Sequence, residues 1–365
     1  MKFLLCNWRH KEEVKGGCET IFSELSEMLN EMGHETKLVS FNNSKKTLGI
    51  GLEKEGMAFF EVEASHVIDL YCKRYQELYP DTWIISNAGI VNFWYKHANV
   101  INIFNDPYKT LVDKLLRIGF YGSTTYNKYG NIMVRMQQEG ACGATNIAIS
   151  DFMVNEMSKI GVEPDITIPH GIDLELFKPM DKKVLREKYG IPKGMKVVVW
   201  SKDFHPVAGF HIISELIKKR KDIFWVLNFK LGNNGRIKAK NVKILQPVER
   251  EMMPEIYNLG DFLINPSVIE SFGLVPLEAM ACGIPCVVAN TGFVWEKGMK
   301  GVEERQYGVL VNPWNAESYE KAIDMLLAGN IGRFEPRKFA EQFSKEKWKQ
   351  EWKKAIEELC KTKIT

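Results

Sequence analysis

The sequence predicts an α/β protein made of two doubly wound, Rossmann-like domains, and three observations support this prediction. Short apolar runs alternate with helix-like segments along the chain, a pattern typical of parallel sheets covered on both faces. A Pro- and Gly-containing segment at residues 168–173 interrupts the alternation, which then restarts. The chain has 365 residues, more than one core normally holds. We therefore expect an N-terminal domain over residues 1–169 and a C-terminal domain over residues 170–344.

In the first half of the chain, five apolar runs are expected to be buried strands: residues 2–6, 35–40, 83–86, 100–104 and 147–150. The helical spacing of Ile21, Leu25 and Leu29 predicts a helix over residues 18–32. Gly33 then ends this helix. Further helices are expected at residues 111–118 and 154–160.

The second half repeats the pattern with six expected strands: residues 196–200, 223–228, 242–245, 261–265, 285–289 and 308–311. The helices expected between them include residues 210–219, 254–259 and 316–328. Asn315 is a suitable N-cap for the last of these helices, and Gly329 a suitable stop. This half therefore predicts a second doubly wound domain.

The C-terminal segment forms an amphipathic helical pattern. Trp348, Trp352, Ala355 and Leu359 share one stripe, and lysines occupy the other faces. We expect the helix over residues 345–365 to pack back on the N-terminal domain. The alternative is that a cationic helix of this kind lies on an anionic membrane surface.

Composition excludes several classes of protein. The net charge of +3 argues against a nucleic-acid partner. Seven cysteines lack the paired spacing of a zinc site or the density of a disulfide scaffold. No apolar stretch has the length of a secretory or transmembrane segment. We expect a cytoplasmic protein with reduced thiols, and any contact with the inner membrane face to be peripheral.

The window that carries chemistry is residues 265–283, NPSVIESFGLVPLEAMACG. It reads as a strand end, a loop and a short helix that contains Pro276 near its start. Ligands of doubly wound sheets bind beyond the carboxyl ends of the strands. The backbone amides of Phe272, Gly273, Leu274 and Val275 are expected at the helix N-terminus, where they would bind a diphosphate.

Glu270 and Glu278 are expected to have different tasks, because one precedes the helix and the other lies within it. Carboxylates accept hydrogen bonds from pairs of hydroxyl groups. We therefore expect Glu270 to hold sugar hydroxyls and Glu278 to hold the ribose diol of a nucleotide. Two glutamates at this spacing are usually unrelated surface charges, but the glycine, proline and small residues around this pair favour a site.

This window resembles the E-x7-E signature of the retaining glycosyltransferases of family 4, which have the GT-B fold. Residues 270–287 follow the family pattern closely, and four further segments resemble family motifs in the family's order: residues 16–19, 168–179, 291–296 and 308–311. The resemblance implies two domains that face each other across a cleft. It also implies a nucleotide-diphosphate sugar as the donor, bound in the C-terminal domain.

Residue by residue, the resemblance implies that Glu270 contacts the donor sugar, that residues 272–275 bind the diphosphate and that Glu278 binds ribose. Gly16 and Gly17 would line the cleft. Lys202 stands where the family carries an Arg that neutralises the diphosphate, so Glu270 and Lys202 are the expected catalytic residues. The chain departs from the family at Ala208, where a Lys is usual. Lys202, together with His205, is then expected to compensate for the missing charge.

A second departure is Asn105-Asp106-Pro107, where many relatives carry a His that can titrate. Asn105, Asp106 and the interdomain His170 are the residues expected to contact the acceptor or the cleft. Phe293 replaces a glycine of the loop at residues 291–296 and would narrow it.

The predicted function is therefore transfer of a sugar to an acceptor hydroxyl with retention of anomeric configuration, without a metal or a further cofactor. The acceptor is a glycan, a lipid or a small molecule. Two alternatives remain open: a nucleotide-sugar epimerase, and a catalytically silent protein that binds a nucleotide sugar. An NAD-dependent oxidoreductase is disfavoured because no GxGxxG follows the first strand.

Overall fold

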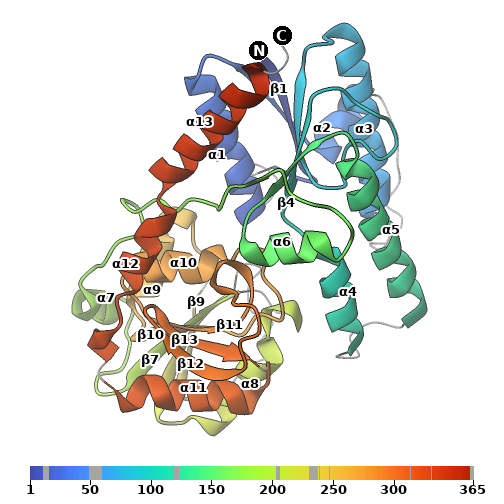
Figure 1. Ribbon diagram of the computed structural model, residues 1–365. Coiled ribbons are helices and arrows are strands. Elements are labelled where there is room, and N and C mark those ends of the chain that lie inside the picture. Colours follow the sequence, from blue (N-terminus) through green and yellow to red (C-terminus); the bar gives the residue numbers. More distant parts are fainter. Residues whose placement is uncertain are drawn as a thin grey trace. The chain divides into compact units, whose positions relative to one another are not determined.

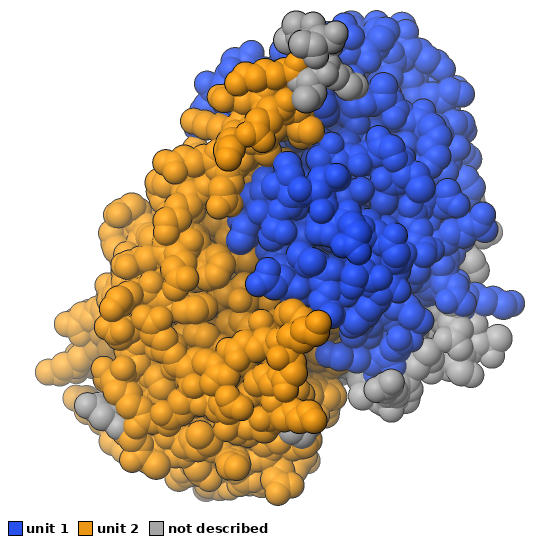
Figure 2. Space-filling model, viewed as in Figure 1, with its two compact units in different colours: residues 1–169 blue, residues 170–365 orange. Residues whose placement is uncertain are grey.

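The computed structural model describes the chain except residues 11–15, 49–59, 118–122, 203–205, 230–236, 238, 246, 313, 330 and 362–365. The chain divides into two compact units, Met1–Pro169 and His170–Thr365 (Figure 2). Each unit is built around one sheet with helices against its faces (Figure 1). The predicted fold class, α/β with two Rossmann-like domains, is confirmed.

Unit 1 contains a six-stranded parallel sheet in the order β2-β1-β3-β4-β5-β6. Its strands are β1 (Lys2–Cys6), β2 (Glu35–Val39), β3 (Trp83–Asn87), β4 (Val100–Phe104), β5 (Thr145–Ala148) and β6 (Ile166–Thr167). Its helices are α1 (Gly17–Glu31), α2 (Phe41–Leu48), α3 (Phe60–Leu78), α4 (Tyr108–Arg117), α5 (Ser123–Ala141) and α6 (Asp151–Ser158). Alternate strand residues such as Leu4 and Ile84 pack against Ile68 and Cys72 of α3, as the two-residue repeat of a strand requires.

A fully buried carboxylate organises the loop that follows β3. The two oxygens of Asp69 on α3 accept the backbone amides of Asn92 (3.2 Å), Trp94 (2.8 Å) and Tyr95 (3.0 Å), and Asp69 also pairs with His97 Nε2. A carboxylate that accepts several backbone amides fixes a loop without any regular secondary structure.

Gln76 orients the ring of His97. Gln76 Nε2 donates to the carbonyl oxygens of Thr82 (2.8 Å) and Ala98 (2.7 Å), so Gln76 presents its oxygen to His97 Nδ1 at 3.2 Å. His97 Nδ1 must therefore donate. Because Nε2 faces the carboxylate of Asp69, both ring nitrogens of His97 contact oxygen atoms that the fold holds in place.

Unit 2 contains a seven-stranded sheet in the order β12-β13-β11-β10-β7-β8-β9, parallel except for the antiparallel edge strand β12. Its strands are β7 (Lys196–Ser201), β8 (Ile223–Asn228), β9 (Val242–Leu245), β10 (Phe262–Asn265), β11 (Cys286–Ala289), β12 (Gly301–Arg305) and β13 (Gly308–Asn312). From β7 the chain adds β8 and β9 on one side and returns with β10 on the other side. The topological switch point therefore lies between β7 and β10.

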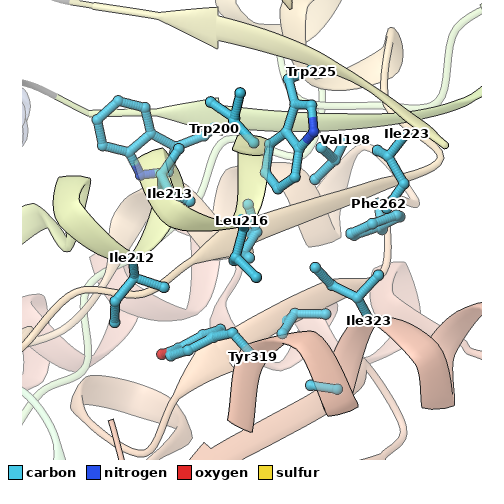
Figure 3. Packing of buried hydrophobic residues seen from close by; sticks show 14 of the residues in the cluster. Val198, Trp200, Ile212, Ile213, Leu216, Ile223, Trp225, Phe262, Tyr319 and Ile323 are labelled. Carbon is cyan, nitrogen blue, oxygen red and sulfur yellow. The ribbon is translucent and has the colours of Figure 1, made fainter. Parts of the chain in front are cut away.

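One face of this sheet packs on α8 (Phe210–Lys219) and α11 (Ala316–Ala328). Figure 3 shows Trp200 and Trp225 from the strands above Leu216 of α8, with Tyr319 and Ile323 of α11 below. All five side chains are inaccessible to solvent. Burying aromatic and aliphatic side chains of this size contributes on the order of 1.5–3 kcal/mol each, so this layer is a principal source of stability for unit 2.

The remaining helices of unit 2 are α7 (Lys182–Lys188), α9 (Met253–Asn258), α10 (Leu274–Ala281), α12 (Pro336–Ala340) and α13 (Lys345–Lys361). On α13, Trp348, Trp352, Ala355 and Ile356 are buried. The stripe predicted from the sequence is thus covered in this structure, apart from the half-buried Leu359. Packing of this helix on the N-terminal domain stays a prediction.

Most expected elements are found within one to three residues of their predicted bounds. The strand predicted at residues 147–150 is β5 at Thr145–Ala148, because the Ser150 hydroxyl instead accepts the amide of Met153 and caps α6. The sequence analysis missed α3, α5 and the antiparallel β12. As predicted, Asn315 caps α11 and Gly329 follows its last residue.

We predict that Asp69→Asn destabilises unit 1 by at least about 1–3 kcal/mol, the usual cost of leaving a buried hydrogen-bonding group unsatisfied. The amide keeps one acceptor oxygen and places an NH₂ group against backbone donors. Urea unfolding measures the change. Asp113→Asn is the control, because this carboxylate lies 3.7 Å from Lys109 on the surface and should change the unfolding free energy by less than about 0.5 kcal/mol. Equal effects of the two substitutions would contradict the role of Asp69.

Candidate donor site in unit 2

Two of the predicted site residues meet at the switch point of the unit 2 sheet. Lys202 follows β7, and Glu270 lies in the loop after β10. Their side chains form an ion pair, with Lys202 Nζ 2.6 Å from Glu270 Oε1. Asn265, the last residue of β10, donates to the same oxygen at 3.2 Å. The sequence analysis expected each residue at a donor site but did not predict that they pair.

The surroundings of Glu270 keep it ionised. Burial on its own would raise the pKa of this carboxyl group, but the charge of Lys202 and hydrogen bonds from Lys202, Ser267 and Asn265 outweigh burial and hold the pKa below its ordinary value. Glu270 is thus a fixed hydrogen-bond acceptor with a cation beside it. This combination suits recognition of a hydroxyl group next to an anion.

The turn between Glu270 and α10 presents unpaired amides. Gly273 precedes α10 and has φ 106° and ψ 59°, a left-handed conformation that a side chain disfavours. Within the part of the chain that the structure describes, the amides of residues 272–275 donate to no protein acceptor. Their predicted position at the start of α10 is confirmed. Binding of a diphosphate there remains a prediction.

A second loop holds this turn in place. Thr291 Oγ1 accepts the Glu270 amide and donates to the Glu270 carbonyl oxygen, both at 3.0 Å. The Phe293 amide donates to the Phe272 carbonyl oxygen at 2.8 Å. Gly292 has φ 65°, and a Cβ atom there would lie 2.1 Å from the Phe272 carbonyl oxygen. The backbone at Gly292 therefore approaches the backbone at Phe272 so closely that this position requires glycine. Thr291 binds the backbone of Glu270 beside it.

Aromatic rings pack behind the turn. Phe272 contacts Phe293 with ring centroids 5.3 Å apart, and Phe343 edge-on at 5.8 Å. His170 meets Phe272 edge-on at 5.1 Å. Burial lowers the pKa of His170 to about 3, so its ring is neutral at physiological pH. The structure thus gives His170 a position that supports the turn, and its predicted contact with an acceptor stays untested.

Glu278 lies inside unit 2, with both of its oxygens engaged. Arg250 Nη1 donates to Oε1 and the Tyr257 hydroxyl donates to Oε2, each at 2.6 Å. Phe177 packs beside them, with the Arg250 guanidinium 5.1 Å from its ring centroid. The sequence analysis missed Arg250 and Tyr257. No local motif marks them, because each lies more than twenty residues before Glu278 and only the packing of α9 on α10 brings them together.

Ala208, which stands where a Lys was expected, is a buried residue between β7 and α8. It offers no polar group, so Lys202 is the cation that the structure places beside Glu270. His205 lies outside the described residues.

The predicted residues of unit 1 lie at the carboxyl edge of its sheet or beside it. Gly16 precedes α1 and Gly17 begins it. Asn105 and Asp106 follow β4, and Asn87 at the end of β3 binds both: it accepts from Asn105 Nδ2 at 3.3 Å and donates to Asp106 Oδ2 at 3.1 Å. The predictions that Gly16 and Gly17 line a cleft and that Asn105 and Asp106 contact an acceptor stay untested.

The described residues contain no group of three or more His, Cys, Asp or Glu side chains placed to hold a metal ion. Among the helices that the structure describes, none combines the length and the apolar character needed to cross a bilayer.

The second half of the chain is similar in sequence to known glycosyltransferases. Residues 181–350 match the family model "Glycosyl transferases group 1". The D-inositol 3-phosphate glycosyltransferase of Segniliparus rotundus is 29% identical over 178 residues, which cover 44% of this chain and 38% of that protein. That of Catenulispora acidiphila is 28% identical over 205 residues, or 50% of this chain and 47% of that protein. The alignments thus span less than half the length of these relatives.

Solved structures resemble the whole chain. A sucrose-phosphate synthase from Thermosynechococcus elongatus has a TM-score of 0.78 at 15% identity and covers 99% of both chains. Anabaena HepE, in complex with UDP-glucose, has a TM-score of 0.68 at 19% identity and covers 98% of this chain and 100% of its own. These likenesses show the fold, which is that of GT-B glycosyltransferases. The chain therefore has a GT-B fold, and its residues 181–350 are similar to the glycosyltransferases of group 1.

Proposed function

We propose that this protein transfers a sugar from a nucleotide-diphosphate donor to an acceptor hydroxyl, with retention of anomeric configuration. The observation that carries the proposal is the turn at residues 272–275, whose amides have no acceptor among the described residues, next to the Lys202–Glu270 pair. Anions bind where free amides and a helix dipole converge. The match to glycosyltransferase group 1 over residues 181–350 supports the same conclusion.

In this proposal the diphosphate lies against the amides of residues 272–275, and Lys202 supplies the positive charge. Glu270 accepts hydrogen bonds from hydroxyl groups of the donor sugar. When the diphosphate begins to leave, the added negative charge falls on groups that are already oriented, which is how such sites lower a barrier. UDP-glucose in the crystal structure of HepE supports a nucleotide sugar as the donor.

Glu278 is proposed to hold the ribose diol. A carboxylate has about four acceptor positions, and Arg250 and Tyr257 use one on each oxygen. The two protein donors fix the carboxylate plane and leave one position on each oxygen for a hydroxyl group. A pre-oriented acceptor pair is better suited to a diol than a mobile surface glutamate.

The acceptor is proposed to bind unit 1 near Asn105 and Asp106, and to be a glycan, a lipid or a small molecule. The proposed reaction uses neither a metal ion nor a cofactor beyond the nucleotide sugar. The protein is further proposed to be cytoplasmic. Any contact that it makes with the inner membrane face is proposed to be peripheral.

We predict that Glu278→Ala abolishes the thermal stabilisation that the best donor gives. The panel contains UDP-, GDP-, ADP- and TDP-sugars, since a ligand that binds the folded state raises its apparent stability. Glu255→Ala is the matched control, because Glu255 is likewise held by a cation and a tyrosine, Lys188 at 2.6 Å and Tyr189 at 2.8 Å. The control should keep the stabilisation. A normal response of Glu278→Ala would refute the ribose role.

We predict that Lys202→Met lowers the rate of nucleoside diphosphate release by about 100-fold or more, the usual effect of losing one oriented stabilising group. The pKa of Glu270, followed by carboxyl NMR, should rise, because burial would no longer be opposed by the neighbouring charge. Lys182→Met removes a different paired lysine, 3.4 Å from Asp261, and should leave the rate unchanged. A Lys202→Met protein with the wild-type rate would contradict the proposal.

Retention is tested separately by NMR of the product formed from a donor of known anomeric configuration. We expect the coupling constant of the anomeric proton to report the donor's configuration. The inverted configuration would contradict retention while leaving transfer intact, and an epimerised donor formed without an acceptor would contradict transfer itself.

A further inference from the structure

The ion pair at the candidate donor site joins two groups that the proposed reaction uses separately. Lys202 Nζ lies 2.6 Å from Glu270 Oε1, and the two side chains are 22% and 16% exposed. The proposed function assigns Lys202 to the diphosphate and Glu270 to the hydroxyl groups of the sugar. In this structure each group therefore takes up part of the binding capacity of the other.

Glu270 is held in place more firmly than Lys202. Thr291 Oγ1 binds both the amide and the carbonyl oxygen of Glu270, each at 3.0 Å. Glu270 Oε1 also accepts from Asn265 at 3.2 Å, and Ser267 fixes that amide by donating to Asn265 Oδ1 at 3.1 Å. The ammonium group of Lys202 ends a long, flexible side chain. When the pair separates, we therefore expect Lys202 to move.

The pair has no net charge, which weakens its attraction for an anion. Ala208 is buried where a second lysine was expected, and Lys202 is the cation that the structure places beside Glu270. A lysine that stays paired with a carboxylate attracts a diphosphate weakly, because repulsion from the carboxylate offsets the attraction of the ammonium group. Strong attraction requires that Lys202 leave Glu270.

Separation of the pair is unfavourable for Glu270. Burial on its own would raise the pKa of this carboxyl group, and the charge of Lys202 is the largest effect that opposes burial. A buried carboxylate that loses its cation costs free energy unless other donors take the place of the cation. A diphosphate brings negative charge and acceptor oxygens, so it cannot replace Lys202 as the partner of Glu270.

A sugar can replace Lys202 at Glu270. The hydroxyl groups of a sugar donate hydrogen bonds, and an ionised carboxylate accepts them. An intact nucleotide sugar therefore supplies a partner for each group, with phosphate for Lys202 and hydroxyls for Glu270. A nucleoside diphosphate supplies a partner for Lys202 alone.

We infer that the Lys202–Glu270 pair opposes the binding of a nucleoside diphosphate, and that the sugar of an intact donor removes this opposition. The inference rests on the proposed transfer reaction. It gives Glu270 a second task, selection of the substrate over the product, besides its proposed contact with the sugar. Once the sugar has been transferred, Lys202 returns to Glu270 and favours release of the nucleoside diphosphate, a step that limits turnover in many enzymes.

The opposite arrangement has a definite consequence as well. An ammonium group has several donors, so a lysine is able to bind a phosphate oxygen without leaving its carboxylate. In that arrangement Glu270 would hold Lys202 in position and assist the binding of a nucleoside diphosphate. The two arrangements predict opposite effects of removing the charge of Glu270, so one substitution decides between them.

The test is titration calorimetry of the full chain with UDP and with UDP-glucose, at one pH and one salt concentration. If another donor stabilises the wild-type protein more, that donor and its nucleoside diphosphate replace this pair of ligands. We expect Glu270→Gln to lower the Kd for UDP by about fivefold or more, the lower end of the usual range for coupled equilibria. The Kd for UDP-glucose should fall by a smaller factor or rise, because an amide accepts sugar hydroxyls more weakly than a carboxylate does.

Glu255→Gln is the matched control, because Glu255 likewise lies 2.6 Å from a lysine, Lys188. This variant should leave both Kd values within about twofold of the wild type, as loss of a weak surface pair does. In a Lys202→Met protein, Glu270→Gln should tighten UDP binding by a smaller factor, since no lysine is left to be released. Thermal unfolding of each variant reports its folding.

One measurement needs no variant. Carboxyl NMR of the wild-type protein follows the titration of Glu270 in the free protein, with UDP and with UDP-glucose. We expect UDP to raise the pKa of Glu270, because a buried carboxylate loses its neighbouring cation. UDP-glucose should raise this pKa less, because hydrogen bonds from the sugar hydroxyls stabilise the charged form.

A Glu270→Gln protein that binds UDP no more tightly than the wild type would overturn the inference, and so would equal pKa shifts of Glu270 with the two ligands. A wild-type protein that binds no nucleotide sugar of the panel and no nucleoside diphosphate would overturn the proposed function, and this inference with it. The two failures are distinguishable because the second appears before any variant is made.

Discussion

The candidate donor site depends on one backbone constraint: within the described residues, the turn before α10 must leave the amides of residues 272–275 without a protein acceptor. Gly273 adopts a conformation that other residues disfavour, and the loop at residues 291–293 binds both the Glu270 backbone and the Phe272 carbonyl oxygen. Both contacts hold the turn in place, while the amides of residues 272–275 donate to no acceptor in the part of the chain that the structure describes. Rigid, unpaired donors are what anion binding requires, because no protein hydrogen bond has to break first.

Both units bring polar side chains together where the direction of strand addition reverses. In unit 2 this position brings together Lys202 and Glu270 from strands that are neighbours in the sheet but 68 residues apart in sequence. In unit 1 it brings together Asn7, Asn87 and Asp106. In each case the order of the strands, and not a local motif, brings these side chains together. The two constellations differ in charge, since one contains a cation and the other is built from amides and a carboxyl group.

The sequence was sufficient for the fold class, for most strands and for the window at residues 265–283, because apolar periodicity and a compact motif are local signals. It was insufficient where contacts span long stretches of sequence. Arg250 and Tyr257 meet Glu278 only through the packing of α9 on α10, and Asn87 meets Asp106 only through the order of strands in the sheet. The helix at residues 60–78 was missed although it carries Asp69, whose partners Asn92, Trp94, Tyr95 and His97 lie more than twenty residues away.

The account depends most directly on whether the turn before α10 binds phosphate. Titration of the ¹⁵N-labelled protein with UDP, followed by amide NMR, tests this without any catalysis. The account predicts that the amide resonances of Gly273, Leu274 and Val275 move downfield as they begin to donate to a charged oxygen. If UDP binds and shifts other resonances while these three stay in place, the turn is not the phosphate site and the central claim is wrong.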